Sequence, residues 1–225
     1  IIELICVHLR LKENGQKSLK QNKINKRFVY LISPNKIKGK EFYINLEQVL
    51  KSKKVSFFQL RLKNETSRNK ISIGKKIKKI CKKHRVKFLV NDEPYLAKKL
   101  KADGCHIGQK DMSILKVKKI LKNKIIGITC HNSINLVKQA IKRQPNYIAL
   151  GAFYSSKTKK VKFKANIQLL KYAKTMTNIP IVVIGGIKSN NYKKLLLNKA
   201  NFLAISGYIW NNKKLKPMEA INKLK

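Results

Sequence analysis

Acidic residues are scarce in this chain. Only 10 Asp and Glu stand against 53 Lys and Arg, which gives a formal net charge of +43 over 225 residues. Such an excess often indicates a protein that binds nucleic acid. Here the lysines are spread over every predicted helix and loop together with many Asn and Ile, and A/T-rich coding explains all three residue types. No concentrated basic patch, aromatic platform or known motif is present, so we do not expect nucleic acid as a partner, although the charge should attract polyanionic substrates.

Cysteine pairs at metal-binding spacing are also missing. The four cysteines Cys6, Cys81, Cys105 and Cys130 are scattered, and no C-x-x-C occurs. This spacing argues against zinc and is typical of free thiols in a cytoplasmic protein. No apolar run reaches the length of about 20 residues that spans a membrane, and the apolar opening is too short for a signal peptide. We therefore expect a cytoplasmic protein without a membrane partner.

The chain does contain a regular alternation of short apolar strands and amphipathic helices. Residues 1–26 are polar after a brief apolar start, and we expect them to be an extension of a single domain over 27–225. The predicted strands lie at 27–33, 56–62, 86–90, 104–108, 125–129, 147–151, 179–186 and 202–207. The predicted helices lie near 46–52, 69–84, 94–101, 113–122, 134–144, 166–176, 191–199 and 217–224.

Eight strands alternating with helices predict parallel βα units with right-handed crossovers. Eight such units close naturally into an α/β fold of the (β/α)8 TIM barrel type, and the chain length agrees with a single barrel. A doubly wound open sheet is the main alternative. It has no need of eight regular units, and no G-x-G-x-x-G follows the first strand. The barrel is therefore the predicted fold.

Two of the ten acidic residues lie just past the C-terminal ends of neighbouring predicted strands. Asp92 follows VKFLV, and Asp111 follows GCHIG. Barrels place their chemistry at this edge of the strands. Paired carboxylates in a cationic protein suit Mg²⁺, which takes one or two carboxylates together with substrate phosphate oxygens. The alternative is that Asp92 only caps the helix beginning near Pro94.

Other polar residues follow the remaining strands. Gln59, Arg61 and Lys63 alternate along the second strand and should share its inward face, where burying the charges would be costly without an anionic partner. Further candidates at the strand ends are Asn91, Gln109, Thr129, His131, Ser155, Ser156, Lys157, Thr158, Lys159, Gly186, Ser206 and Gly207. Glycine backbone amides and hydroxyls beside lysine can each hold a phosphate. Their convergence on one rim predicts a phosphorylated substrate, a diphosphate and Mg²⁺.

Several segments carry a more specific pattern. They are FQLRLKN (58–64), FLVNDEPYLAKKLKADGCHIGQKD (88–111), IIGITCHN (125–132), YIALGAFYSSKTK (147–159), IPIVVIGGI (179–187) and ANFLAISGYIW (200–210). With these segments the chain resembles the thiamine-phosphate synthase family, which joins a hydroxymethylpyrimidine diphosphate to a thiazole phosphate. The resemblance covers the chain from about residue 27 to 210, in the family's order and spacing.

The resemblance implies a role for each candidate residue. Asp92 and Asp111 would bind Mg²⁺. The pyrimidine diphosphate would be held by Gln59, Arg61, Lys63, Asn91, Thr129 and Lys159. The thiazole phosphate would be held by Ser156, Lys157, Thr158, Gly186, Ser206 and Gly207. Diphosphate would leave the pyrimidine methylene carbon and the thiazole nitrogen would attack the resulting cation, so that Arg61, Lys63 and Lys159 serve catalysis by neutralising the leaving group.

Two departures from the family pattern and two alternative functions stay open. The stretch KVKFKANIQLL after Lys159 lacks the usual glycine-containing segment, and Asn201-Phe202 replaces the usual Asp-Gly. One alternative is a thiazole tautomerase on the same barrel, which would need neither Mg²⁺ nor a leaving diphosphate. The other is a basic nucleic-acid-binding protein on an inactive barrel, which predicts salt-sensitive binding without turnover. We expect His106 to be a hydrogen-bonded barrel residue, and the sequence leaves a homo-oligomer open.

Overall fold

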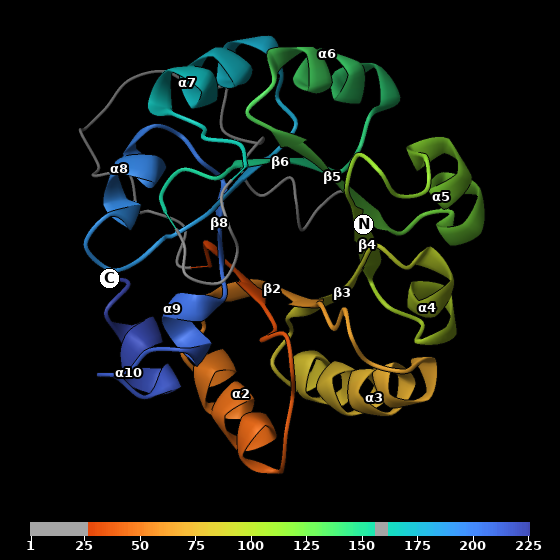
Figure 1. The fold of residues 1–225 in the computed structure, drawn as a ribbon, viewed down its shortest axis with the longest axis vertical. Helices are drawn as coiled ribbons and strands as arrows, with labels where there is room; N and C mark the ends of the chain where they lie inside the picture. The colour runs from red at the N-terminus through yellow and green to blue at the C-terminus, as the bar shows by residue number, and fades with distance from the viewer. Residues whose placement is uncertain (1–26, 156–161) are drawn as a thin grey trace, which may run out of the picture.

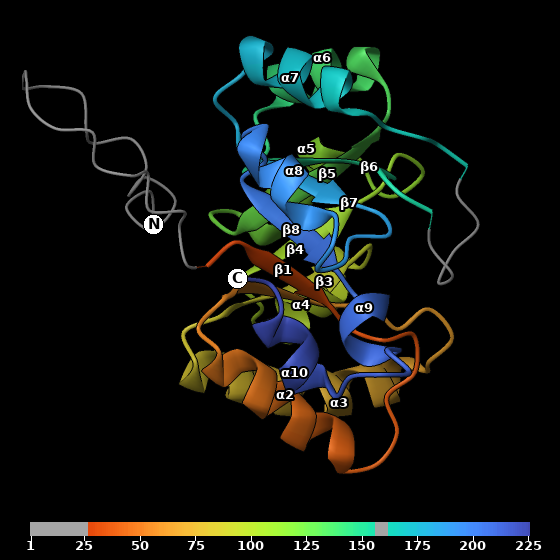
Figure 2. The ribbon, with the colours of Figure 1, turned by 90° about the vertical axis from the view of Figure 1, so that its left-hand side faces the viewer.

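A computed structural model describes residues 27–155 and 162–225, and these residues form a closed barrel of eight parallel strands in the order β1 to β8. Figure 1 shows the helices as an outer ring around the strands, and Figure 2 shows the same barrel from the side. The predicted (β/α)8 barrel is therefore confirmed. The extension expected at 1–26 lies outside the described residues.

The bounds of the elements follow the predicted alternation. The strands are β1 (Val29–Ile32), β2 (Val55–Leu60), β3 (Lys87–Asn91), β4 (Gly104–Ile107), β5 (Ile125–His131), β6 (Tyr147–Gly151), β7 (Ile181–Ile184) and β8 (Phe202–Ile205). The described helices are α2 (Glu41–Lys51), α3 (Ser67–Lys83), α4 (Pro94–Lys99), α5 (Ile114–Leu121), α6 (Ile134–Arg143), α7 (Ile167–Met176), α8 (Tyr192–Leu197), α9 (Gly207–Trp210) and α10 (Pro217–Asn222). None of the described helices is long and apolar enough to cross a membrane.

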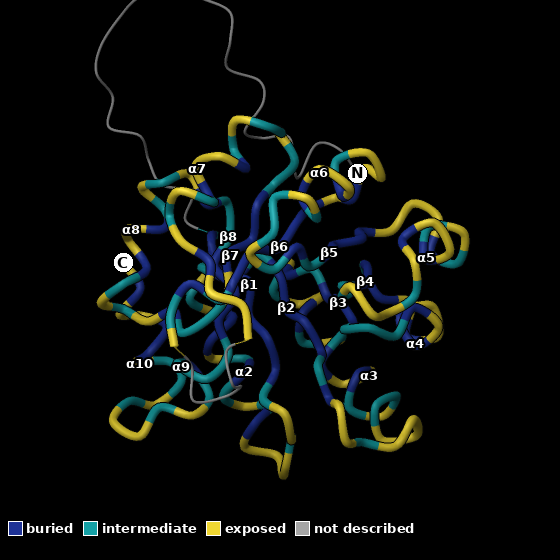
Figure 3. Tube along the Cα trace, turned by 45° about the horizontal axis from the view of Figure 1, so that its top comes forward, coloured by how far each residue is buried: buried dark blue, intermediate teal, exposed yellow. Residues whose placement is uncertain are grey.

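The alternation of side chains along each strand produces two apolar cores. On β2, Phe58 and Leu60 point outward and pack against the helices, whereas Phe57 points into the barrel. Inside the barrel, the Phe57 ring lies 5.4 Å from that of Tyr30, and the Tyr30 ring lies 5.7 Å from that of Tyr147. Figure 3 shows buried strands at the centre and exposed outer faces on the helices. The barrel interior is thus a packed core. Side chains that a substrate can reach lie at the ends of the strands.

The same type of hydrogen bond, from a backbone amide of one strand to a side-chain oxygen just before the next strand in the barrel, recurs at the N-terminal end of the barrel. Asp103 accepts a hydrogen bond from the backbone amide of Phe88 at 2.8 Å, and Asn146 and Asn201 accept equivalent bonds at 2.8 Å from the starts of β5 and β7. Asn201 therefore supplies the acceptor that an aspartate would supply. Phe202 beside it packs edge-on against Phe57 at 5.0 Å. This departure from the family pattern is accommodated within the barrel.

Gly127 of β5 gives Tyr147 its place inside the barrel. A Cβ at this position would lie 1.9 Å from the Tyr147 ring, which is 3% exposed and has no room to move. We expect Gly127→Ala to lower the free energy of unfolding by about 1–3 kcal/mol through overpacking. Urea denaturation followed by circular dichroism measures the change. An unchanged midpoint would show that Tyr147 is not held as the structure places it.

Candidate active site

Two amides join the C-terminal ends of β2 and β3. Gln59 points into the barrel, is 3% exposed and donates from Nε2 to Asn91 Oδ1 at 2.5 Å. Asn91 is the last residue of β3. Burying the Gln59 amide is tolerable because it donates to Asn91, which is half-buried. The pair forms the floor of the barrel mouth on this side.

Arg61 and Lys63 lie beyond the strand on which the sequence placed them. The structure ends β2 at Leu60, so both residues belong to the loop that follows, and the expectation that both are buried on the strand's inward face is wrong. Arg61 is half-buried and donates from Nη1 to Asn35 Oδ1 at 3.1 Å. The Lys63 side chain is 56% exposed and reaches back over the mouth. Both cations therefore lie at the rim, where an anionic substrate can meet them.

The two aspartates are brought together by successive turns. The Asp92 backbone amide donates to the His106 carbonyl at 2.7 Å, and its φ of +62° turns the chain sharply after β3. Asp111 Oδ2 accepts from the Gly108 amide at 2.7 Å, which folds the turn after β4 back on itself. Helix α4 has Glu93 at its N-cap position with no capping side chain, so the alternative that Asp92 caps this helix is wrong.

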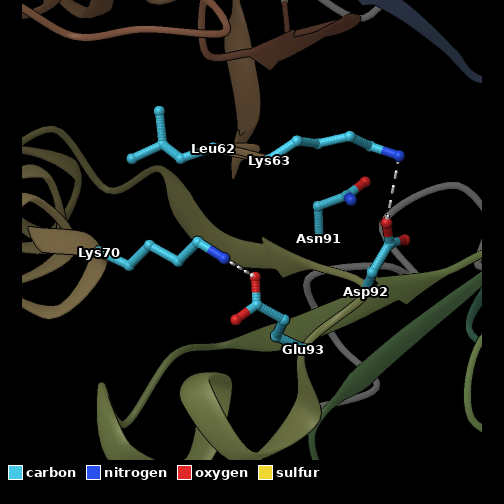
Figure 4. Close-up of a pocket in the computed structure, with 6 residues that line it drawn as sticks. All are labelled: Leu62, Lys63, Lys70, Asn91, Asp92 and Glu93. Atoms are coloured by element: carbon cyan, nitrogen blue, oxygen red, sulfur yellow. Dashed lines mark hydrogen bonds and ion pairs between the residues drawn. The ribbon is translucent and has the colours of Figure 1, made fainter. Parts of the chain in front are cut away.

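The charge around Asp92 is unbalanced. Burial, followed by the hydrogen bond and charge of the neighbouring Asp111, raises the pKa of its carboxyl to about 6. Lys63 opposes this shift, because its Nζ lies 3.9 Å from Asp92 Oδ2. Figure 4 shows the two side chains facing each other. One ammonium at that distance does not offset burial beside a second carboxylate. Asp92 and Asp111 are therefore the residues at this rim that could hold a divalent cation.

A second ion pair borders the aspartates and was not found from the sequence. Lys70 of α3 bonds Glu93 at 2.6 Å, and the lysine side chain is only 12% exposed. Both residues line a pocket of about 180 Å³ together with Asp92, Leu62, Lys63 and Asn91. Figure 4 shows their side chains beside Asp92. The only available signal was that Glu93 directly follows Asp92, because its partner lies 23 residues away. Lys70 neutralises the charge of Glu93, and the ion pair holds the start of α4 against α3.

His106 of β4 points into the barrel below the mouth. Its Nε2 lies 2.8 Å from Thr129 Oγ1, and its Nδ1 lies 2.9 Å from the Tyr147 hydroxyl. Burial lowers the pKa of the imidazole to about 4, so the ring is neutral at physiological pH. The expectation that His106 is a hydrogen-bonded barrel residue is confirmed. Tyr147 was missed, because a tyrosine within an apolar strand does not reveal which face it occupies.

Glycines mark the mouth on the side of β7. Gly185 and Gly186 have φ of +108° and +58°, and a Cβ on Gly186 would lie 2.2 Å from the Ser155 carbonyl oxygen. Both glycines are thus required for the chain after β6 to pass close to the end of β7. Ile184, the last residue of β7, is 36% exposed at the same place and was not found from the sequence. It supplies an apolar wall to the mouth.

The last predicted residues follow β8 and β6 in the chain. Ser206 donates from Oγ to the Ser33 carbonyl at 3.1 Å, and Gly207 begins the short helix α9. Ser156, Lys157, Thr158 and Lys159 lie outside the described residues. On the far side of that loop, Phe163 packs against His131 at 4.3 Å between ring centroids, and its carbonyl accepts from the Ala152 amide.

Comparisons with known proteins agree with this arrangement. Residues 29–209 match the family model described as thiamine monophosphate synthase. The chain belongs to the thiamine monophosphate synthase family. It is 71% identical over 207 residues to the thiamine-phosphate synthase of Pelagibacter ubique, a match that covers 92% of this chain and 100% of that relative. It is 38% identical over 188 residues to the thiamine-phosphate synthase of Erythrobacter litoralis, which covers 81% of this chain and 88% of that relative.

A solved structure extends the likeness to three dimensions. Thiamine phosphate pyrophosphorylase from Pyrococcus furiosus superposes with a TM-score of 0.77 at 25% identity, covering 90% of this chain and 96% of that one. The resemblance inferred from the sequence motifs is thereby confirmed, together with the transferase class. The roles of the individual site residues in this member of the thiamine monophosphate synthase family stay predictions.

Proposed function

We propose that this chain is a Mg²⁺-dependent thiamine-phosphate synthase. It couples 4-amino-2-methyl-5-hydroxymethylpyrimidine diphosphate to thiazole phosphate and releases diphosphate. The observation that carries the proposal is the meeting of Asp92 and Asp111 at one rim with Arg61 and Lys63. Membership of the family and the named relatives support the reaction class.

The aspartate pair fits Mg²⁺. The two carboxylates are neighbours, and the pKa of Asp92 is raised to about 6. A divalent cation bound between them would offset their mutual repulsion. Among residues 27–155 and 162–225, no group of three or more His, Cys, Asp or Glu side chains gathers. A two-carboxylate site suits Mg²⁺, which keeps positions for water and substrate phosphate oxygens. When bound, the ion neutralises charge on the departing diphosphate.

The remaining residues bind and orient the two substrates. Arg61 and Lys63 place positive charge at the rim, where charge develops on the leaving group. The buried amide of Gln59 and the half-buried amide of Asn91 offer directional hydrogen bonds to the pyrimidine. Ile184 supplies an apolar wall that excludes water from a cationic intermediate. No protein nucleophile is required, because binding energy and alignment of the two rings carry the reaction.

Further residues complete the proposal on the other side of the mouth. Gly186, Ser206 and Gly207 follow β7 and β8, and we assign them to the thiazole phosphate. We assign Ser156, Lys157 and Thr158 to the same phosphate and Lys159 to the diphosphate, in keeping with the family pattern. The proposal also places the enzyme in the cytoplasm, in keeping with the free buried thiols of Cys81, Cys105 and Cys130 among the described residues. We treat 27–225 as the catalytic domain and 1–26 as an extension.

The pKa of Asp92 predicts how metal affinity depends on pH. Because the carboxyl titrates near pH 6 and a cation binds its ionised form, Mg²⁺ affinity should fall about tenfold per pH unit below 6 and level off above it. Binding at pH 5.5 should release protons, which isothermal titration in buffers of different ionisation enthalpy measures. Without metal, the folded state holds the Asp92 proton more tightly than the unfolded state, so stability should fall as pH rises from 4 to 6. A pH-independent affinity over this range would contradict the assignment.

Turnover tests the function directly. The full chain incubated with both substrates and Mg²⁺ should form thiamine phosphate and diphosphate, and a chelator should stop the reaction. A tautomerase would instead exchange a proton on a thiazole carboxylate phosphate without needing the metal or the pyrimidine substrate. A nucleic-acid-binding protein would bind DNA or RNA in a salt-sensitive manner and form no product. Failure to form thiamine phosphate under any Mg²⁺ concentration would overturn the proposal.

A further inference from the structure

A chain of polar groups crosses the barrel interior below the mouth. The Tyr30 hydroxyl of β1 lies 2.7 Å from the Tyr147 hydroxyl of β6, which lies 2.9 Å from His106 Nδ1 of β4. His106 Nε2 lies 2.8 Å from Thr129 Oγ1 of β5. Tyr30 is 1% exposed and Tyr147 3% exposed. Four strands thus contribute one continuous line of hydrogen bonds that ends at the mouth.

The direction of these bonds follows from counting donors. A neutral imidazole carries one N–H donor and one acceptor nitrogen, and each hydroxyl carries one hydrogen to donate. Among the described residues, Tyr147 is the hydrogen-bond partner of the Tyr30 hydroxyl. The hydrogen of Tyr30 therefore has an acceptor only if Tyr30 donates to Tyr147.

One proton arrangement satisfies the donors of Tyr30, Tyr147 and His106 together. If Tyr30 donates to Tyr147, then Tyr147 donates to His106 Nδ1, and the ring proton sits on Nε2 and is donated to Thr129. The opposite tautomer makes Nδ1 a donor to the Tyr147 oxygen, and the hydrogen of either Tyr30 or Tyr147 is then left without an acceptor in a buried site, which is costly. An imidazolium also leaves one tyrosine hydrogen without an acceptor, and it buries a charge as well. The first arrangement is therefore preferred.

This proton arrangement also fixes the direction in which the Thr129 hydroxyl can donate. Its hydroxyl oxygen already accepts from His106, so its own hydrogen is free to point away from the ring. The Thr129 carbonyl accepts a hydrogen bond from Gln109 Nε2, which fixes the backbone at this position from the rim. The side chain is half-buried at the mouth. Thr129 is thus presented as a hydrogen-bond donor with a defined direction.

We propose that His106 is a positioning residue, protonated on Nε2, that makes the Thr129 hydroxyl a donor toward the mouth. The substrate atom that meets Thr129 must then be an acceptor. This last step rests on the proposed function, under which the acceptor is an unprotonated ring nitrogen of the pyrimidine and not its exocyclic amino group. Tyr147 sets the tautomer from below, and Tyr30 completes the line.

Nitrogen-15 spectra of the full chain with labelled histidine test the tautomer without any substrate. His106 should carry its proton on Nε2 and leave Nδ1 unprotonated from pH 6 to 8, with its signals assigned by their loss in His106→Gln or by their shift in Thr129→Val. Tyr147→Phe removes the group that makes Nδ1 an acceptor and should give a mixture of both tautomers. Tyr30→Phe should keep the Nε2 proton, because Tyr147 can still donate only to His106. A proton on Nδ1, or on both nitrogens, in the unaltered chain would overturn the proposal.

Steady-state kinetics distinguish a positioning role of the Thr129 hydroxyl from a purely structural one. Thr129→Val should raise KM for the pyrimidine diphosphate about tenfold, as expected for one lost hydrogen bond, while Thr129→Ser should stay within about twofold of the unaltered chain. KM for thiazole phosphate should not change in either variant. Equal KM values for Val and Ser would contradict the donor role of the hydroxyl. If the Nε2 tautomer is found but no thiamine phosphate forms, the proposed function fails and the positioning of Thr129 stands.

Discussion

Asp92→Asn should lower kcat/KM by about three orders of magnitude at saturating Mg²⁺. A metal ion contributes several kcal/mol to stabilising the leaving group, and each 1.36 kcal/mol is a factor of ten in rate. Asparagine has the same shape as aspartate and tolerates the φ of +62° found here, so the fold should be intact. Steady-state rates and the Mg²⁺ concentration at half-maximal rate measure the effect.

Glu93→Gln provides the matched control for this variant. Glu93 is the next residue along the chain and undergoes the same chemical change, but its carboxylate is paired with Lys70. We expect kcat/KM to stay within about fivefold, because a partly exposed ion pair contributes about 1 kcal/mol or less. Undiminished activity of Asp92→Asn, or an equal loss in both variants, would show that Asp92 does not hold the metal.

Arg61→Ala should raise KM for the pyrimidine diphosphate by about 10- to 100-fold. Hydrogen bonds to charged groups contribute about 1.5–3 kcal/mol, and the half-buried guanidinium lies at the rim beside Asn35. KM for thiazole phosphate should stay within about twofold, because the residues assigned to that phosphate follow β6, β7 and β8. Initial rates with each substrate varied in turn separate the two effects.

Arg27→Ala tests whether any lost arginine has the same effect. Arg27 precedes β1 and donates to the Arg85 carbonyl at 3.1 Å, at the N-terminal end of the barrel and away from the mouth. This variant loses the same charge and should leave both KM values within about twofold. Parallel increases for both substrates in Arg61→Ala, or equal effects of the two arginine variants, would count against a specific contact with the diphosphate.

The sequence was sufficient to predict the barrel because each strand is a short apolar run closed by polar residues. Eight such runs separated by helices have few other ways to bury both faces. The aspartates were found for a different reason. Acidic residues are so rare in this chain that Asp92 and Asp111, each just after a strand, were conspicuous. The structure adds that Asp111 lies close enough to raise the pKa of Asp92.

Other features could not be predicted, because they depend on contacts between residues far apart in the sequence. Tyr30 and Tyr147 meet across 117 residues, and a tyrosine within an apolar strand gives no indication of such a partner. The pairing of β2 with β1 ends at Gln59 and its pairing with β3 ends at Leu60, so the polar alternation that continues to Lys63 misled the prediction of the strand. The short helix α9 was missed because four residues are too few to show a period.

Diffraction from crystals grown with Mn²⁺ in place of Mg²⁺ and with diphosphate tests the central claim most directly. The anomalous signal of the metal should lie between the carboxylates of Asp92 and Asp111, with diphosphate oxygens completing its ligands and Arg61 and Lys63 on the diphosphate. A metal bound elsewhere, or diphosphate bound away from these four side chains, would contradict the account.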